Sequence, residues 1–299
     1  MLNICGKEVR IEGRLLRIAK LDGDGFVFLE QDPEEFLAAL RASGRRADIF
    51  TFIQRLPNTS PLYRYPMEWE NFAAVEVTTF DHWWNHQIGF KARNKAKQAA
   101  KKGVVLRGLE FSDELARGIW EIYSETPIRQ GRSFRHYGKD LPTVTRETAT
   151  YLSQSIFIGA FFEGKLIGFA KIVMDDTRTQ AGFMNIISMV KHKDKAPTNA
   201  LFAEAIRSCA QRKIRYLVYS QFAYGNKTRS GLADFKERNG MRKMDVPRYY
   251  LPLTTTGKIA LRLGLHKPLK SGLPAPLLAM LRELRAAWYR RRLPFTSGT

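Results

Sequence analysis

The stretch from residue 156 to residue 253 constrains the fold of this 299-residue chain more than any other part of the sequence. Two apolar runs, residues 156–162 and 166–174, flank the turn sequence Glu163-Gly164-Lys165 and so predict a β-hairpin. The other expected elements of this stretch are, in chain order, a strand at 183–190, a helix from Pro197, a strand at 215–219, a helix at 232–239 and a strand at 246–250. This succession predicts an α/β fold with a mixed sheet.

A basic segment, residues 191–196, joins the third of these strands to the helix that opens with Pro197-Thr198-Asn199. The first turn of a helix leaves backbone N–H groups unpaired and carries about half a positive charge. We therefore expect this loop–helix step to hold a phosphate-bearing ligand.

The net charge of +20 predicts an anionic partner, which would be nucleic acid, acidic lipid headgroups or a phosphorylated ligand. The cations concentrate in residues 81–107 and 258–292, each of which contains a single acid. No apolar run approaches the roughly 18 residues of a membrane-spanning helix, and the first residues lack the apolar core of a signal peptide. Cys5 and Cys209 fit no metal spacing, so a reduced cytoplasmic setting is expected.

The N-terminal part of the sequence predicts a small α/β unit. Its expected elements are strands at 9–19, 26–29, 49–55 and 73–77, and a helix that starts at Asp32 and ends near Gly44. Residues 81–102 predict one long basic helix that stops at Gly103. The expected domains are residues 1–80, 81–103, 104–253 and 254–299, the last being a basic helical tail.

Between the basic helix and the hairpin, the pattern predicts a short strand at 104–107 and helices at 113–125 and 143–153. The segment 126–141 between these two helices has little periodicity and is rich in polar and aromatic residues, which is typical of a functional or mobile loop. Residues 277–292 form an amphipathic, arginine-rich pattern, which predicts a helix packed on the domain or an interfacial helix that touches an anionic membrane or RNA.

The order of elements from residue 104 onward resembles the GNAT acyltransferase fold. Residues 159–169 resemble the central hairpin of that family, and residues 235–241 resemble its last helix and the following turn. The resemblance implies a reduced N-terminal GNAT-like half and a complete C-terminal GNAT domain. It also implies an N-acyltransferase that moves an acyl group from acyl-CoA (acetyl-CoA) to the amine or hydroxyl of a small-molecule or peptide acceptor.

GNAT enzymes bind the acyl-CoA pyrophosphate at a Gln/Arg-x-x-Gly-x-Gly/Ala signature, and residues 191–200 stand at the matching position without a glycine. Glycine normally permits the close approach of backbone to ligand. By position, the cofactor-binding residues implied are Val190, Lys191, Lys193, Lys195, Thr198, Asn199 and Ala200.

Residues 91–104 are similar to the basic helix that opens the second GNAT domain of Fem-type aminoacyl-tRNA-dependent transferases. That resemblance implies charged tRNA as the donor instead of acyl-CoA. The residues expected to contact nucleic acid are Lys91, Arg93, Lys95, Lys97, Lys101 and Lys102. A third alternative is a non-catalytic GNAT scaffold that binds RNA or an anionic membrane, with steeply salt-dependent binding.

Catalytic candidates follow from the same resemblance. Tyr224 is placed to protonate a departing thiolate or alkoxide, and Asn226 to orient the acyl donor, although Gly225-Asn226 is also ordinary turn chemistry. His192 is a candidate general base because its unperturbed pKa lies near neutrality.

The acceptor is expected to meet the irregular segment and the third strand. The substrate-binding candidates are Arg129, Arg132, Arg135, His136, Tyr137, Asn185 and Ser188. Asn185 and Ser188 share no face of a strand, because their separation is odd. His82 and His86 have zincin spacing but lack the glutamate and a third ligand, so no metal is expected.

Overall fold

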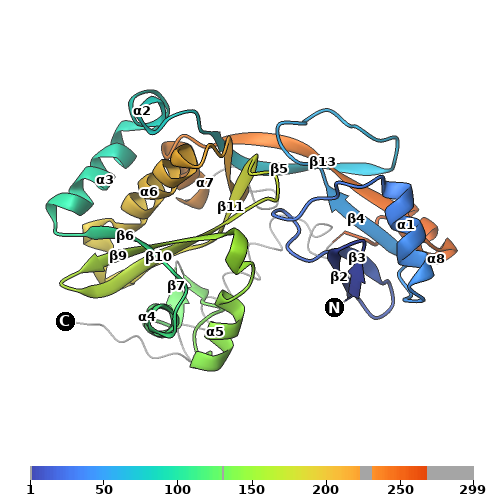
Figure 1. Ribbon diagram of the computed structural model, residues 1–299, viewed down its shortest axis with the longest axis horizontal. Helices are drawn as coiled ribbons and strands as arrows, with labels where there is room; N and C mark the ends of the chain where they lie inside the picture. Colours follow the sequence, from blue (N-terminus) through green and yellow to red (C-terminus); the bar gives the residue numbers. More distant parts are fainter. Residues whose placement is uncertain (1, 130, 223–230, 268–299) are drawn as a thin grey trace. The chain divides into compact units, whose positions relative to one another are not determined.

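The computed structural model describes residues 2–129, 131–222 and 231–267, which form two compact units (Figure 1). Unit 1 contains Met1–Gly89, Val173–Phe183 and Ile206–Leu269, and unit 2 contains Phe90–Ile172, Met184–Ala205 and Lys270–Thr299. The domains expected from the sequence follow chain order, whereas these units do not. The reason lies in one long strand near the C-terminus, which pairs with the N-terminal strands.

Unit 1 is built on a mixed sheet in the order β1-β2-β3-β4-β13-β5-β12-β11. Its strands are β1 (Leu2–Ile4), β2 (Lys7–Glu12), β3 (Ile18–Leu21), β4 (Ile49–Ile53), β5 (Met67–Glu76), β12 (Tyr216–Gln221), β13 (Arg242–Pro252) and the beginning of β11 (Gln180–Ser188). β13 pairs antiparallel with β4 at Tyr249↔Phe52 and with β5 at Met244↔Phe72. The C-terminal strand therefore completes the N-terminal sheet.

The helix α1 (Pro33–Ala42) forms as the sequence predicts. The Asp32 side chain accepts a hydrogen bond from the Glu34 N–H at 2.8 Å, and Phe36, Leu37 and Leu40 are buried against the strands. Two strand predictions in this region are wrong. Residues 9–19 contain β2, a turn and β3 instead of one strand, and residues 26–29 form no strand, because the chain turns back tightly at Gly23.

The single long helix predicted for residues 81–102 is also wrong. The chain forms α2 (Phe80–His82, capped by Thr79), a π-helical turn η1 (Trp83–Gln87) and α3 (Phe90–Lys101). The Gly89 N–H donates to the Arg238 carbonyl at 2.8 Å, and a Cβ at Gly89 would lie 3.1 Å from that oxygen. The helix breaks because Gly89 docks closely on the end of α7 (Gly231–Arg238).

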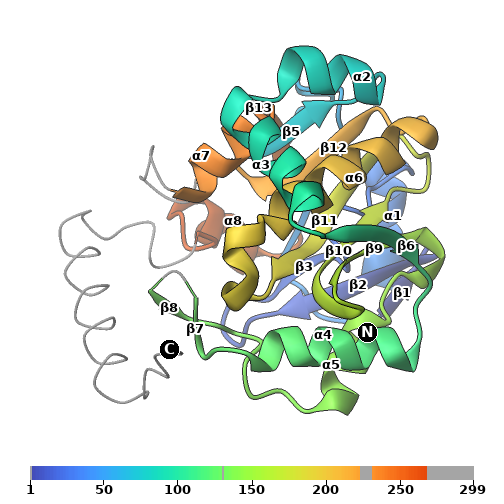
Figure 2. The same cartoon turned by 90° about the vertical axis from the view of Figure 1, so that its left-hand side faces the viewer.

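Unit 2 carries the strands β6 (Val105–Leu109), β9 (Ser155–Phe162), β10 (Lys165–Met174) and the end of β11, in the order β11-β10-β9-β6. The hairpin β9–β10 is confirmed. The helices α4 (Asp113–Ser124) and α5 (Leu141–Thr148) cover one face, and α3 and the start of α6 (Pro197–Gln211) cover the other, as Figures 1 and 2 show. α5 begins two residues before the prediction, because Asp140 accepts from the Thr143 N–H at 3.0 Å and so caps it.

The expected irregular segment contains a small hairpin, β7 (Ile128–Arg129) with β8 (Arg132–Ser133). The core of unit 2 lies between α4 and the strands, and it includes the three inward residues of the prediction, Leu115, Ile119 and Ile122. A short 3-10 turn, η3 (Val190–Lys195), joins β11 to α6.

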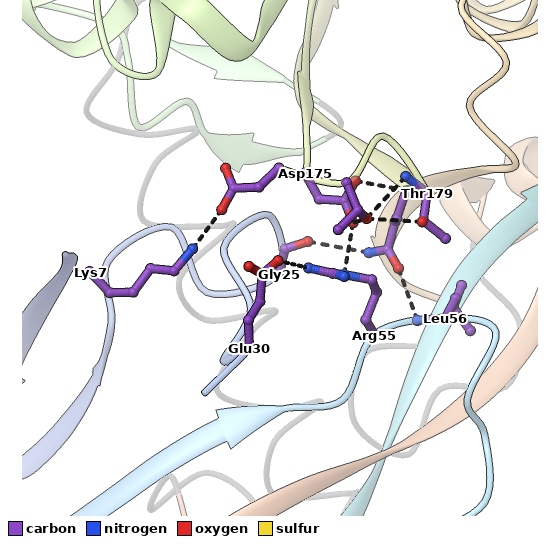
Figure 3. Close-up of polar contacts among 10 residues, drawn as sticks. Lys7, Gly25, Glu30, Arg55, Leu56, Asp175 and Thr179 are labelled. Atoms are coloured by element: carbon purple, nitrogen blue, oxygen red, sulfur yellow. Dashed lines mark hydrogen bonds and ion pairs between the residues drawn. The ribbon is translucent and has the colours of Figure 1, made fainter. Parts of the chain in front are cut away.

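β11 and β12 run parallel and pair at Gln180↔Tyr216, Ala181↔Leu217 and Gly182↔Val218, where their pairing ends. A polar network in unit 1 holds the turn before β11 (Figure 3). Arg55 pairs with the buried Asp175 at 2.8 Å and with Glu30 at 2.7 Å. The network thereby fixes where β11 begins. Burying Asp175 without a cation would cost far more than this pairing does.

Candidate functional site

The turn η3 and the start of α6 stand where the resemblance places a phosphate, but a side chain of the protein occupies the first backbone donors. The Glu125 carboxylate, at the end of α4, accepts from the Val190 N–H at 2.6 Å and from the Lys191 N–H at 2.9 Å. The Glu125 side chain is only 13% exposed. A carboxylate and a phosphate compete for the same donors, so this part of the turn already carries an anion.

Two N–H groups later in the loop also donate to a carbonyl group of the chain itself. Asn199 and Ala200 donate to the Ala196 carbonyl at 3.1 and 3.4 Å, and Pro197 has no N–H. The Thr198 hydroxyl bonds the Ser188 hydroxyl at 2.7 Å. The expected cofactor-binding loop therefore uses the backbone donors of Val190, Lys191, Asn199 and Ala200 for its own structure.

Two of the expected cations near this loop are paired with Asp194. Lys102 donates to the Asp194 carbonyl and carboxylate, both at 3.1 Å, and Lys195 lies 3.5 Å from the same carboxylate. The hydrogen bond from Lys102 lowers the pKa of the Asp194 carboxyl. Lys102, predicted to contact nucleic acid, thus ties α3 to η3, while Lys191 and Lys193 remain exposed.

Arg129, predicted to bind the acceptor, is used inside unit 2. Its guanidinium donates to the Ser188 carbonyl at 2.7 Å and to the Ile122 carbonyl at 2.9 Å, and it pairs with Glu125 at 3.2 Å. These contacts hold the Glu125 carboxylate in place, and a role of Arg129 in binding an acceptor stays a prediction. Arg132 and Tyr137 are exposed.

Three other acceptor candidates come together around Tyr123. The His136 ring stacks on the Tyr123 ring with centroids 4.3 Å apart, and Asn185 donates to the Tyr123 hydroxyl at 3.4 Å. Arg135 donates from Nε to His136 Nε2 at 3.0 Å. Because arginine only donates, the His136 proton is assigned to Nδ1, which is buried and bonds no group in the described part of the chain.

This cluster, Tyr123–His136–Asn185, offers a neutral N–H donor. Burial, helped by the positive charge of Arg135, lowers the pKa of His136 to about 4, so the imidazole is uncharged near pH 7. Tyr123 was missed in the sequence, although it follows Ile119 by one helical turn on the inward face of α4. An uncharged donor beside an amide suits the carbonyl or hydroxyl of a substrate.

We expect His136 to make the stability of the protein depend on pH. Its folded pKa of about 4 lies below the unfolded value of about 6.5. The unfolded chain therefore binds the proton first as pH falls, and stability present above pH ~6.5 is lost toward pH ~4, by about 2 kcal/mol after allowance for solvent screening. Guanidinium denaturation at pH 7.5 and 4.5 should show this loss in the natural protein and a smaller one in His136→Asn.

The exposed His82 supplies the control for this measurement, because its ring is not buried. His82→Asn should retain the full loss between pH 7.5 and 4.5. Equal losses in the natural protein and in His136→Asn would show that the His136 ring is protonated in the folded state without penalty.

His192 lies in η3 with its ring centroid 5.7 Å from that of Phe162. Burial, together with Lys195 and Lys191, lowers its pKa, so it is uncharged near pH 7. Its role as a general base stays a prediction. The other catalytic candidates, Tyr224 and Asn226, lie outside the described residues, as does the tail pattern 277–292.

A buried lysine in unit 1 was missed by the sequence reasoning. The Lys236 side chain is fully buried on α7; its ammonium donates to the Gln221 carbonyl at 2.5 Å and lies 4.7 Å from the centre of the Tyr219 ring. Burial lowers the pKa of Lys236 to about 8. Gln221 ends β12, immediately before the segment that contains Tyr224. The helical spacing of Ala233, Lys236 and Asn239 could have indicated this burial, because it places the lysine on the inward face of α7.

Lys236 begins a chain of polar contacts through unit 1. Gln221 donates to Glu70 at 3.3 Å, Glu70 pairs with Arg248, and Arg248 pairs with Asp24 at 2.7 Å. Burial raises the pKa of Asp24, although Arg248 opposes that change. Buried ionic groups of this kind cluster at functional sites more often than elsewhere.

Within residues 2–129, 131–222 and 231–267, no group of three or more His, Cys, Asp or Glu side chains could hold a metal ion. In the same ranges, no helix has the length and apolar character needed to cross a bilayer.

Comparison with known proteins gives likeness of structure without detectable likeness of sequence. No protein-family model and no curated protein matches the sequence. FemX aligns with a TM-score of 0.57 at 10% identity, over 86% of each chain. L-PGS from Bacillus licheniformis aligns at 0.56 and 15%, over 85% of each chain. The DUF2156 C-terminal domain of a lysylphosphatidylglycerol synthetase candidate from Agrobacterium fabrum aligns with a TM-score of 0.56 at 15% identity. The alignment covers 85% of this chain and 82% of that one.

These likenesses extend over both units of the chain. The protein therefore has a mixed α/β, GNAT-like fold similar to those of FemX and L-PGS, and the fold class predicted from the sequence is confirmed.

Proposed function

We propose that the protein is a GNAT-fold transferase that takes its acyl group from aminoacyl-tRNA and not from acyl-CoA, and delivers it to an amine or hydroxyl acceptor. The observation that carries the proposal is the pairing of the Glu125 carboxylate with the N–H groups of Val190 and Lys191. Transfer from acyl-CoA is the alternative that the GNAT resemblance implies.

The energetic argument concerns the displacement of Glu125. A pyrophosphate at η3 would have to break two charge-assisted hydrogen bonds, each worth about 1.5–3 kcal/mol. The displaced carboxylate would also lose its ion pair with Arg129 and remain close to the phosphates. A cost of about 3–6 kcal/mol corresponds to an affinity roughly 100- to 10,000-fold lower, which would leave CoA binding too weak to be useful.

The outward face of α3 supports tRNA as the donor. Lys91, Lys95, Lys97 and Lys101 are exposed, while Ala92, Ala96 and Ala99 face inward. A helix that buries only alanine and presents lysine to solvent suits the phosphates of a nucleic acid. The names of FemX and of L-PGS, which matches along most of its length, agree with the Fem-type branch of the resemblance.

The reaction proposed is attack of the acceptor nitrogen or oxygen on the ester carbonyl of aminoacyl-tRNA. A new amide or ester bond forms, the bond from the carbonyl carbon to the ribose oxygen breaks, and the ribose leaves as an alcohol with the proton that the acceptor loses. Lys236 is the candidate group for stabilising the negative charge that develops in this step, because a buried ammonium acts in a low-dielectric setting. Most of the remaining catalysis is positioning.

The test compares donors on the natural protein. Titration calorimetry with acetyl-CoA should show no binding in the micromolar range, and filter binding with total tRNA should show retention that weakens between 50 and 200 mM salt. Radiolabelled aminoacyl-tRNA should lose its amino acid to an acceptor in a cell extract. Micromolar binding of acetyl-CoA by the natural protein would refute the proposal, and tRNA retention without any transfer would favour a non-catalytic RNA-binding scaffold.

Two substitutions at Glu125 sharpen this test. Glu125→Ala frees the N–H groups of Val190 and Lys191, whereas Glu125→Gln leaves an acceptor oxygen in place without the charge. If the carboxylate is what excludes pyrophosphate, the alanine variant should bind inorganic pyrophosphate more tightly than the glutamine variant does, and the natural protein should bind it least.

A further inference from the structure

The helix α8 (Thr255–Arg262) is held rigidly on unit 1. The Thr254 hydroxyl donates to the buried Asp48 carboxylate at 2.8 Å and accepts from the Gly257 N–H at 3.0 Å. A Cβ at Gly257 would lie 1.9 Å from the Asp48 carbonyl oxygen, so the helix approaches the strand as closely as only glycine allows. This anchor fixes which face of α8 points inward, namely the face of Gly257 and Ala260.

The opposite face of α8 and the turn after it expose large aliphatic side chains. Ile259 is 52% exposed, Leu263 67% and Leu265 63%. Lys258 and Arg262 stand beside them and are also exposed. We name this set, Lys258, Ile259, Arg262, Leu263 and Leu265, the α8 face. Exposed aliphatic groups in one short segment, with cations among them and no acid, are unusual for a surface that meets only water.

The sequence that follows has the same character. Residues 268–299 contain six Lys and Arg residues, and Glu283 is their only acid. This composition bears on what can cover the α8 face. A second copy of the chain would bring Lys258 and Arg262 against like charges, and the basic tail would do the same. Nucleic acid would satisfy the cations but would gain nothing from three aliphatic side chains.

We propose that the α8 face docks on an anionic phospholipid bilayer, with Ile259, Leu263 and Leu265 entering the interface and Lys258 and Arg262 meeting the headgroups. An anionic bilayer is the partner that satisfies both kinds of side chain, since apolar burial and attraction to acidic lipid act together. The inference concerns where the protein works and does not rest on the identity of the acyl donor.

The experiment is flotation of the full-length chain with vesicles. The protein should float with vesicles of phosphatidylcholine that contain about 30% phosphatidylglycerol. Its partitioning onto vesicles of phosphatidylcholine alone should be about 10-fold lower. The double variant Ile259→Glu/Leu263→Glu should lose at least about 10-fold of the partitioning, since two apolar contacts become repelled charges.

The matched control is Leu15→Glu/Leu62→Glu, which adds the same two charges at aliphatic side chains that are 95% and 58% exposed elsewhere in unit 1. It should partition as the natural protein does, and both variants should melt at the same temperature as the natural protein. Failure of the natural protein to bind acidic vesicles would overturn the proposal. Equal losses of vesicle binding in the two double variants would also overturn it. So would an Ile259→Glu/Leu263→Glu variant that loses tRNA binding and keeps vesicle binding.

Discussion

Reversing the charge of Lys91, Lys95 and Lys101 to glutamate is expected to weaken tRNA binding about 100-fold at 100 mM salt and to flatten its salt dependence by about three units of slope. All three side chains are exposed on the outward face of α3. Each would lose a phosphate contact and gain a repulsion, while the inward alanines, which hold the helix in place, stay unchanged. Filter binding across a salt series measures both quantities.

A change of six charge units would weaken nucleic-acid binding even at a distance, so the control must carry the same change. Arg45→Glu/Lys165→Glu/Lys213→Glu makes it at three exposed positions outside α3. The control variant should lose far less than the α3 variant. Equal losses would mean that tRNA responds to the net charge of +20 as a whole, and that α3 is an ordinary solvated helix.

Replacing Lys236 by methionine is expected to lower the rate of aminoacyl transfer about 100- to 1,000-fold, the usual loss when one preorganised electrostatic group is removed from a transition state. Methionine fills a similar volume, so the packing of α7 should survive. Because burial lowers the pKa of Lys236 to about 8, a rate that needs the ammonium should fall as pH rises through about 8. Single-turnover transfer from aminoacyl-tRNA across pH 6–9.5 measures both effects.

Two comparisons separate chemistry from folding at this position. Lys243→Met removes an exposed lysine of β13 and should leave the rate and its pH profile unchanged. The Lys236→Met variant should bind tRNA as tightly as the natural protein does. A variant that transfers normally, or a natural protein whose rate does not fall above pH 8, would remove Lys236 from the list of functional groups.

Elements whose signals are local in sequence were predicted well. Glu163-Gly164 predicted the β9–β10 hairpin because both residues take positive φ values, 51° and 77°, as a tight turn of this hand requires. Asp32 and Pro33 marked the start of α1 because capping involves only neighbouring residues. In each case the determining contacts lie within a few residues.

The errors concern contacts between distant segments. The residues near Gly89 in the sequence do not indicate that its N–H will donate to the Arg238 carbonyl and that the helix will break there. The spacing of residues 113–125 predicted a helix, but not that Glu125 would accept from the N–H of Val190, 65 residues later in the chain. Residues 232–239 were predicted as a helix, but the pattern did not show that Lys236 would be buried with its ammonium against the carbonyl of Gln221 and the ring of Tyr219.

The grouping of the acceptor candidates was predictable only in part, and their roles stay predictions. His136, Arg135 and Asn185 were selected by residue type and do come together, yet the residue that unites them, Tyr123, was overlooked because an inward tyrosine on a helix looks like core. Arg129 was selected by the same reasoning and also supports the fold, since its two terminal nitrogens donate to carbonyl groups that no local pattern reveals.

The two backbone hydrogen bonds that the Glu125 carboxylate accepts also bear on how ligands for this protein should be sought. In a protein whose phosphate loop is vacant, an incoming phosphate adds hydrogen bonds that the free chain lacks, and the melting temperature rises with ligand concentration. Here the free chain already holds those bonds through Val190 and Lys191. In a thermal-shift screen, nucleotides and coenzymes would therefore cause no rise in melting temperature through this loop. Ligand discovery needs a readout at the α3 lysines or at the acceptor cluster around Tyr123.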